Sequence, residues 1–291
     1  MDYIQGTDTI RREEIEKMQI MKCKGFNSVD SAVAYFKRHG YKTLIGQYKY
    51  NGARAYWVPE EKKLFSSGDR EILSVPHIVK ALQEYKFPFD GELFNSVMEF
   101  NRINGAVRTL SPTEDSLQLK FYIFDLRQPL VLQEDRTLAL DSFELNSPLI
   151  KCPSFNLSIY ELNTLLRASL FRGFEGIILR NPRAYYRPGY HAHYMWKIKP
   201  IYKVEAEFVG FEKALPGTER HLDTFGSLIL RSLENGRAFK CSGLTEMERY
   251  KLWNNPPTPG TLISVKFGAW SHKETSKRVP LYPRYDTIVG R

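Results

Sequence analysis

The sequence predicts an α+β protein with two domains: antiparallel sheets and helices over residues 1–200, then a small β-barrel over residues 201–291. Three observations support this. A chain of 291 residues exceeds the usual size of one domain. A hydrophobic content of 42% is enough for packed cores. After Pro200, short alternating strands separated by Gly, Pro and Asn replace a mixture of helices and longer strands.

The first part of the chain shows helical and strand periodicities in alternation. Helices are predicted where apolar residues recur every three to four positions, at 9–22, 28–39, 76–85 and 162–170. Gly40 ends the second, and Pro76 begins the third. The last of these follows the capping-box pattern Ser158-x-x-Glu161. Strands are predicted at 43–49, 54–58, 62–66, 90–93, 117–126, 176–180 and 194–198. The pair Asn51-Gly52 between two apolar runs is a cue for a β-hairpin and places Lys49 near a hairpin or another strand turn.

The second part of the chain is built of short strands. They are predicted at 204–211, 226–231, 237–241 and 261–267, with one helix that begins at the capping box Thr245-x-x-Glu248. About five short strands and one helix are typical of an OB-fold. The connection 212–225 between the first two strands is short.

Charge and cysteine content narrow the partners and the compartment. A net charge of +9, spread over both parts of the chain, favours a polyanionic partner such as nucleic acid. We expect no membrane span and no signal peptide, and therefore a cytoplasmic or nuclear protein, because no long apolar run occurs. Three distant cysteines argue against disulfides and against a Cys-x-x-Cys zinc site. His191 and His193 could form a metal pair, but their Tyr-rich loop favours solvated or phosphate-facing side chains.

A group of charged residues lies at the ends of predicted strands. A lysine that attacks a nucleotide phosphate needs cations, carboxylates and an apolar slot for the base. Charged side chains in apolar strands are costly unless they are paired or liganded, which indicates a site. The residues that meet these needs are Lys49, Arg54, Glu92, Phe124, Glu175, Lys197 and Lys199. Taken singly, Lys49 could be a surface lysine, the glutamates could be structural ion-pair partners, and Phe121 rivals Phe124 as the stacking ring.

The order of these segments resembles a known family. The series K-Y-N-G-A-R, F-D-G-E-L, F-Y-I-F-D, E-G-I-I-L-R and W-K-I-K-P is similar to the motifs of covalent nucleotidyltransferases, and most of all to ATP-dependent DNA ligases of the small viral or phage type. Residues 185–189 resemble the loop before the paired-lysine motif, and residues 283–291 resemble the last motif. The resemblance runs from about residue 43 to the end. It implies a nucleotidyltransferase (adenylation) domain followed by an OB-fold domain.

The resemblance also implies roles for single residues. Lys49 would attack the α-phosphate of ATP and carry AMP. Gln47 occupies a place where ligases often read adenine, Phe124 would stack on that base, and Glu92 would bind the ribose. Arg54, Lys197 and Lys199 would contact the AMP, and Arg284 and Arg291 would engage the pyrophosphate. Glu92 and Glu175 would hold Mg²⁺ or Mn²⁺.

Nicked duplex DNA is the partner that the resemblance implies, and the protein is expected to act as a monomer. The AMP would pass to the 5′-phosphate of the nick, and the 3′-hydroxyl would then displace it. Arg180, Arg183 and Arg187 form a basic loop that could contact DNA phosphates or merely be exposed.

Two positions depart from the family pattern. Asn51 stands where DNA ligases have Asp. Some RNA-joining relatives also carry Asn at this position. Ser67 stands where ligases have an arginine. We expect Arg70 to replace that arginine and to contact DNA. An RNA ligase, a capping-type guanylyltransferase and a nick-binding module that does not seal therefore remain as alternatives.

Overall fold

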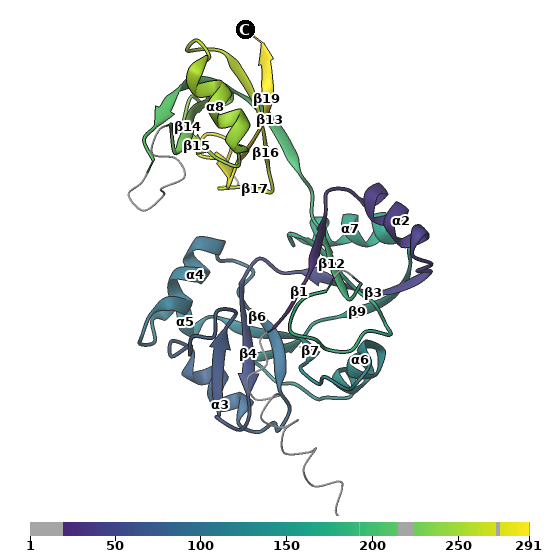
Figure 1. The fold of residues 1–291 in the computed structure, drawn as a ribbon. Coiled ribbons are helices and arrows are strands. Elements are labelled where there is room, and N and C mark those ends of the chain that lie inside the picture. The colour runs from purple at the N-terminus through teal and green to yellow at the C-terminus, as the bar shows by residue number, and fades with distance from the viewer. Residues whose placement is uncertain (1–19, 192, 215–223, 272–273, 291) are drawn as a thin grey trace, which may run out of the picture. The chain divides into compact units, whose positions relative to one another are not determined.

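The computed structural model describes residues 20–191, 193–214, 224–271 and 274–290, which form two compact units, 1–199 and 200–291 (Figure 1). The predicted α+β class is confirmed. The helix predicted at 9–22 lies outside the described residues except at its end, where Met21–Lys22 forms strand β1 instead. No helix in these ranges is long and apolar enough to cross a membrane.

Two five-stranded sheets form the first unit. One has the order β2-β12-β10-β3-β9, and the other has the order β5-β4-β6-β7-β8. Most neighbouring strands are antiparallel, and β2–β12 and β7–β8 are parallel. Strand β1 pairs with β11 (Gly189–Tyr190). The strands of the first sheet are β2 (Lys24–Phe26), β12 (Met195–Ile198), β10 (Gly176–Arg180), β3 (Thr43–Lys49) and β9 (Ser154–Ser158); those of the second are β5 (Lys63–Ser66), β4 (Ala53–Val58), β6 (Phe89–Phe94), β7 (Lys120–Leu126) and β8 (Leu149–Lys151).

Each sheet has its own core and helices. Helices α2 (Val29–Arg38) and α7 (Leu162–Phe171) pack their apolar sides on the first sheet, where Phe36 and Trp196 are fully buried. The second sheet packs around Trp57 and Phe121. Its surrounding helices are α3 (Pro76–Leu82), α4 (Phe100–Arg108), α5 (Glu114–Leu117) and α6 (Gln133–Asp141), of which only α3 was predicted.

The chain passes from one sheet to the other at Asn51-Gly52, and the hairpin alternative is wrong. Strand β3 pairs with β9 and β10, whereas β4 pairs with β5 and β6. Gly52 is required by close approach to β6: a Cβ atom there would lie 2.3 Å from the Leu93 carbonyl oxygen and 2.9 Å from Cγ of Glu92. The turn therefore places the end of β3 against β6 instead of folding β4 back onto β3.

The second unit is an open sheet with the order β15-β14-β13-β16-β19. Helix α8 (Glu246–Asn254) begins at the predicted capping box, which is complete. Within the described ranges the edge strands β15 and β19 are not paired. One isolated bridge joins Ser242, just after β15, to Arg284, and β19 pairs along β16. The expected closed barrel is therefore not formed. The strands are β13 (Tyr202–Glu212), β14 (Ser227–Ser232), β15 (Ala238–Cys241), β16 (Leu262–Phe267) and β19 (Arg284–Gly290), with a small ribbon of β17 (Ala269–Trp270) and β18 (Pro280–Leu281).

Candidate active site

Lys49 meets Glu175 and Lys199 at the ends of three central strands of the first sheet, β3, β10 and β12. The Lys49 Nζ lies 2.5 Å from Oε2 of Glu175, whose Oε1 lies 2.9 Å from Nζ of Lys199. Strand pairing explains the meeting, because Gly176 is the register partner of Lys49. A Cβ atom on Gly176 would lie 2.2 Å from the Ile198 carbonyl oxygen, so only glycine lets the strand of Lys199 approach this closely.

The ion pair determines the charge state of both partners. Burial acts to lower the pKa of Lys49, but the carboxylates of Glu175 and Glu92 together outweigh burial and the pKa of Lys49 is raised. Burial acts to raise the pKa of Glu175, but Lys49 and Lys199 outweigh it and that pKa is lowered. The protein alone therefore holds Lys49 as an ammonium ion. The partly neutral amine that a nucleophile requires is not provided in this arrangement.

Glu92 and Arg54 lie opposite each other on β6 and β4. Glu92 accepts a hydrogen bond from the Gly52 amide at 3.2 Å, and burial raises the pKa of its carboxyl to about 7. Arg54 donates to both carboxylate oxygens of Asp90, at 3.0 and 2.7 Å, and to the Met21 carbonyl at 2.8 Å.

Asp90 is a site residue that the sequence reasoning missed. Its side chain is fully buried, and besides binding Arg54 it accepts a hydrogen bond from the Tyr186 hydroxyl at 2.6 Å. The signal was present, because a carboxylate within an apolar strand is costly unless it is paired. Asp90 fixes the Arg54 guanidinium in a bidentate geometry.

Phe124 is partly exposed on β7, as is Tyr122, whereas the rival ring of Phe121 is fully buried in the core. In the β6–β7 register Asp90 pairs with Asp125 and Gly91 with Ile123, so Phe124 is the extra residue of a β-bulge. Bulges re-aim a side chain relative to its strand. The guanidinium carbons of Arg54 and Arg180 lie 5.3 and 5.2 Å from the ring centroid, within cation–π range.

Arg180 lies inside the protein, not in an exposed basic loop. It is the last residue of β10, it is 1% exposed, and it forms a 2.7 Å ion pair with the buried Asp125. Its Nε donates to Oε1 of Gln47 at 2.9 Å. The prediction that Arg180 contacts DNA phosphates is therefore contradicted, because its side chain is enclosed by protein partners. Gln47 is also buried, and its amide donates to the Phe124 carbonyl and to Ser154 Oγ, both at 2.9 Å.

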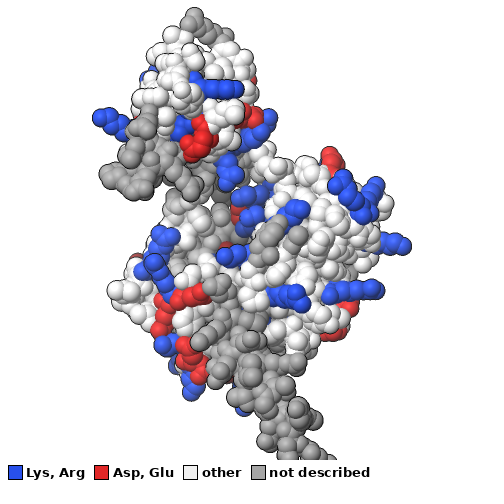
Figure 2. Space-filling view, in the orientation of Figure 1, with Lys and Arg blue, Asp and Glu red and all other residues white. Residues whose placement is uncertain are grey.

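The other predicted residues lie at the surface or at its margin. Lys197 is partly buried on β12, and Arg70, Arg183 and Arg187 are exposed. Arg284 is exposed in the second unit, and Arg291 lies outside the described residues. Lys and Arg side chains are spread over both units on the face that Figure 2 shows.

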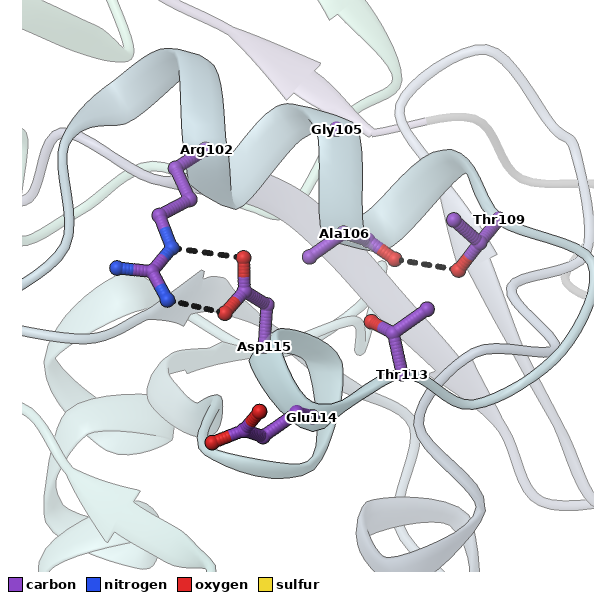
Figure 3. Close-up of a pocket in the computed structure, with 7 residues that line it drawn as sticks. All are labelled: Arg102, Gly105, Ala106, Thr109, Thr113, Glu114 and Asp115. Atoms are coloured by element: carbon purple, nitrogen blue, oxygen red, sulfur yellow. Dashed lines mark hydrogen bonds and ion pairs between the residues drawn. The ribbon is translucent and has the colours of Figure 1, made fainter.

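Neither the histidine pair nor the pocket in Figure 3 adds a second site. His191 Nε2 lies 2.8 Å from the Pro188 carbonyl oxygen, and His193 Nδ1 lies 3.1 Å from the Tyr35 hydroxyl. Within the described ranges, no three His, Cys, Asp or Glu side chains are grouped to hold a metal.

The pocket between α4 and α5 contains none of the predicted site residues (Figure 3). Its lining is Arg102, Gly105, Ala106, Thr109, Thr113, Glu114 and Asp115.

Comparison with known proteins gives a consistent result. The family model of the ATP dependent DNA ligase domain matches residues 20–199. A DNA ligase of African swine fever virus (isolate Pig/Kenya/KEN-50/1950) is 29% identical over 231 residues, which are 72% of this chain and 54% of that protein. The chain thus spans about half the length of the curated relatives it matches.

Two solved structures share the fold across nearly the whole chain. A Lig E DNA ligase structure, described as binding DNA with a minimal scaffold, has a TM-score of 0.74 at 21% identity and covers 92% of this chain and 98% of its own. The Chlorella virus DNA ligase-adenylate has a TM-score of 0.52 at 20% identity, covering 94% and 99%. At these identities the likeness concerns the fold.

Proposed function

Because the chain belongs to the family of ATP-dependent DNA ligase domains, we propose that it seals nicks in duplex DNA through a lysine-AMP intermediate and an adenylated 5′ end. The observation that carries the proposal is the convergence around Lys49. Glu92, Glu175 and Lys199 come from strands or strand ends far apart in the sequence, and the interactions described above bring them to one site.

In the first step Lys49 is the nucleophile. Its Nζ first gives one proton to water and becomes the neutral amine. The amine forms a bond to the α-phosphorus of ATP, the bond from that phosphorus to the bridging oxygen breaks so that pyrophosphate leaves, and Nζ gives a second proton to water. Lys49 is 22% exposed and Glu175 15%, so the pair is reachable by a ligand yet shielded from bulk water. Lys199, on the other oxygen of Glu175, is positioned to contact the same phosphate.

The nucleotide lies across the two sheets in this proposal. Phe124 stacks on adenine, since it is a partly exposed ring re-aimed by a bulge. Glu92 binds the ribose, and Lys197 contacts the α-phosphate. Three of the five N–H groups of the Arg54 guanidinium bind Asp90 and Met21. In this proposal the other two donate to the AMP.

The residues fit a divalent cation of the Mg²⁺ type. Mg²⁺ prefers oxygen ligands and usually takes one or two carboxylates together with water and substrate phosphates. Glu92 and Glu175 offer that set, and Mn²⁺ has the same ligand preference. When bound, such a cation neutralises charge on the phosphates. Both oxygens of Glu175 are engaged by lysines here, so Lys49 and the cation compete for this carboxylate.

The later steps use DNA. The AMP passes from Lys49 to the 5′-phosphate, and the 3′-hydroxyl then displaces AMP to form the phosphodiester. Arg70, Arg183 and Arg187 are exposed cations suited to phosphate contacts. Arg284 and Arg291 of the second unit would engage pyrophosphate. The protein would act as a monomer on nicked duplex DNA.

Labelled nucleotides and a nicked duplex test the proposal. With Mg²⁺ we expect label from α-labelled ATP, and not from GTP, to be retained on the protein, lost in Lys49→Ala, and followed by sealing of nicked DNA. Retention of GTP label would indicate a capping-type enzyme instead. Joining of nicked RNA but not DNA would indicate an RNA ligase. Adenylation without sealing of a pre-adenylated nick would indicate a nick-binding module.

A further inference from the structure

Two buried arginines share one carboxylate behind the Phe124 ring. Asp125 is 1% exposed and lies 2.7 Å from Arg180 and 2.9 Å from Arg136, which are themselves 1% and 0% exposed. Burial lowers the pKa of Arg180 although Asp125 opposes it. An excess cation inside a protein is expensive, and a one-to-one pair of Asp125 with Arg136 would avoid that cost. Arg180 therefore requires an explanation other than charge balance.

Arg180 fixes the orientation of the Gln47 amide. A guanidinium group only donates hydrogen bonds, so the Gln47 atom that faces Arg180 Nε at 2.9 Å must be the carbonyl oxygen Oε1. The NH₂ group must then face the opposite way, where it donates to the Phe124 carbonyl at 2.9 Å. The Phe124 carbonyl, which only accepts, requires the same orientation, so Arg180 and this carbonyl hold the Gln47 amide from its two ends. Loss of Arg180 would remove the donor that holds the oxygen end.

The two hydrogen bonds from Arg180 to Gln47 and from Gln47 to the Phe124 carbonyl form a relay. The Phe124 carbonyl is where this relay reaches the candidate site. Phe124 is the extra residue of the β-bulge, so the β6–β7 register does not fix its backbone. Gln47 belongs to β3 in the other sheet and ties the bulge to it across the interface. The Arg180 guanidinium also lies 5.2 Å from the ring centroid of Phe124.

We propose that Arg180 is a positioning residue for nucleotide binding, which acts through Gln47 to hold the bulged backbone of Phe124 and thereby the ring. The inference rests on the proposed stacking of adenine on Phe124. Arg180 sets the affinity for ATP without touching the nucleotide, because it is enclosed by Asp125, Gln47 and Gln133.

Single-turnover formation of lysine-AMP, followed against ATP concentration in the full chain, tests this. Arg180→Met leaves Asp125 paired one-to-one with Arg136. We expect the apparent KM for ATP to rise about tenfold, which is the usual worth of one buried hydrogen bond, with the maximal rate within about threefold. Gln47→Leu should give the same rise. The double variant should add little to either single change, because both break one relay.

Arg136→Met is the matched control. Arg136 is equally buried and binds the same carboxylate, but its other bonds go to Gln133 and to the Val131 and Ala184 carbonyls, not to Gln47. We expect its KM for ATP to stay within about twofold of wild type, even if its melting temperature falls as in Arg180→Met.

Three results would overturn the inference: an unchanged KM in Arg180→Met or Gln47→Leu, an equal rise in Arg136→Met, or additive effects in the double variant. Should Arg180→Met not fold, Arg180→Lys takes its place, because lysine keeps a cation beside Asp125 but lacks the Nε that donates to Gln47. Wild-type protein that forms no lysine-AMP would overturn the proposed function and this inference together, whereas a working wild type with any of the three results overturns the inference only.

Discussion

The Nζ of Lys49 and the carboxylate of Glu175 form a 2.5 Å ion pair in which each residue stabilises the charged form of the other. The proposed nucleophile is thus held as an ammonium ion by the residue that is also proposed to bind a cation. Any cation or group that takes over Glu175 removes the larger of the two carboxylate contributions that raise the Lys49 pKa, the other being that of Glu92. Ligand binding and activation of the lysine are therefore coupled through one side chain.

Glu175→Gln should move the titration of Lys49 to lower pH. In wild type the pKa of Lys49 is raised because Glu175 and Glu92 together outweigh burial, and an amide at position 175 leaves mainly Glu92 to oppose burial, which acts downward. The pH dependence of Lys49 labelling by an amine-selective reagent, measured by mass spectrometry, reports the midpoint directly. Exposed Lys251 in the same digest is the internal reference. An unchanged or higher midpoint would show that Glu175 does not control this lysine.

Glu92→Gln should stabilise the protein at high pH only. Burial raises the pKa of Glu92 to about 7, whereas an unfolded glutamate titrates near about 4.3. As pH rises between these values the unfolded state loses its proton first, so wild-type stability falls. At pH 8 the variant should be more stable by about 1–3 kcal/mol, and at pH 4 the difference should vanish.

Denaturant unfolding at the two pH values measures this difference. Glutamine keeps the oxygen that accepts from the Gly52 amide, so the comparison isolates the charge. Glu84→Gln, at an exposed position, is the control and should shift both measurements alike. A gain of equal size at pH 4 and pH 8 would mean that ionisation of Glu92 is not the cause.

Local periodicity was sufficient to predict the strands that deliver the site residues. Strands were predicted over 43–49 and 176–180 and are present as β3 and β10. The prediction worked because a short apolar run is typical of a strand that is buried on both faces. The Asn-Gly signal failed because it records only that the chain turns. Whether β4 returns to β3 or joins another sheet depends on β6, which lies about 40 residues further along.

Partners distant in sequence explain the remaining errors. Arg180 carries the same local signal as an arginine that begins an exposed loop, and only Asp125 and Gln47, 55 and 133 residues away, show that it is buried. Asp90 was passed over for the same reason, since Tyr186 lies 96 residues away. Charged residues in apolar strands can be recognised from sequence, but their partners cannot.

Gly52→Ala should damage the site and Gly105→Ala should not. A Cβ at Gly52 would clash with the Leu93 backbone and with Cγ of Glu92, so the chain between β3 and β4 must shift. We expect the free energy of unfolding to fall by about 1–3 kcal/mol and the rate of lysine-AMP formation to fall at least about tenfold. Gly105 lies within α4 (Figure 3), and a Cβ there would have nothing within 4 Å. Alanine at this position should stabilise the protein by about 0.5–1 kcal/mol with unchanged activity. Thermal unfolding and adenylation rates measure both. Equal effects of the two substitutions would contradict the close-approach argument.

Asn51→Asp should leave the fold intact and raise the rate of nick sealing. Asn51 is partly exposed in the crossing between β3 and β4, where aspartate differs by little more than charge. If this position orients the 3′-hydroxyl or a cation, a charged acceptor should do so better, by on the order of fivefold in rate. Sealing of a pre-adenylated nick is the appropriate assay, because it omits the reaction of Lys49 with ATP. Asn51→Ala is the matched variant without an acceptor and should be slower than wild type. A rate for the aspartate variant at or below that of wild type would show that the site is adapted to the amide.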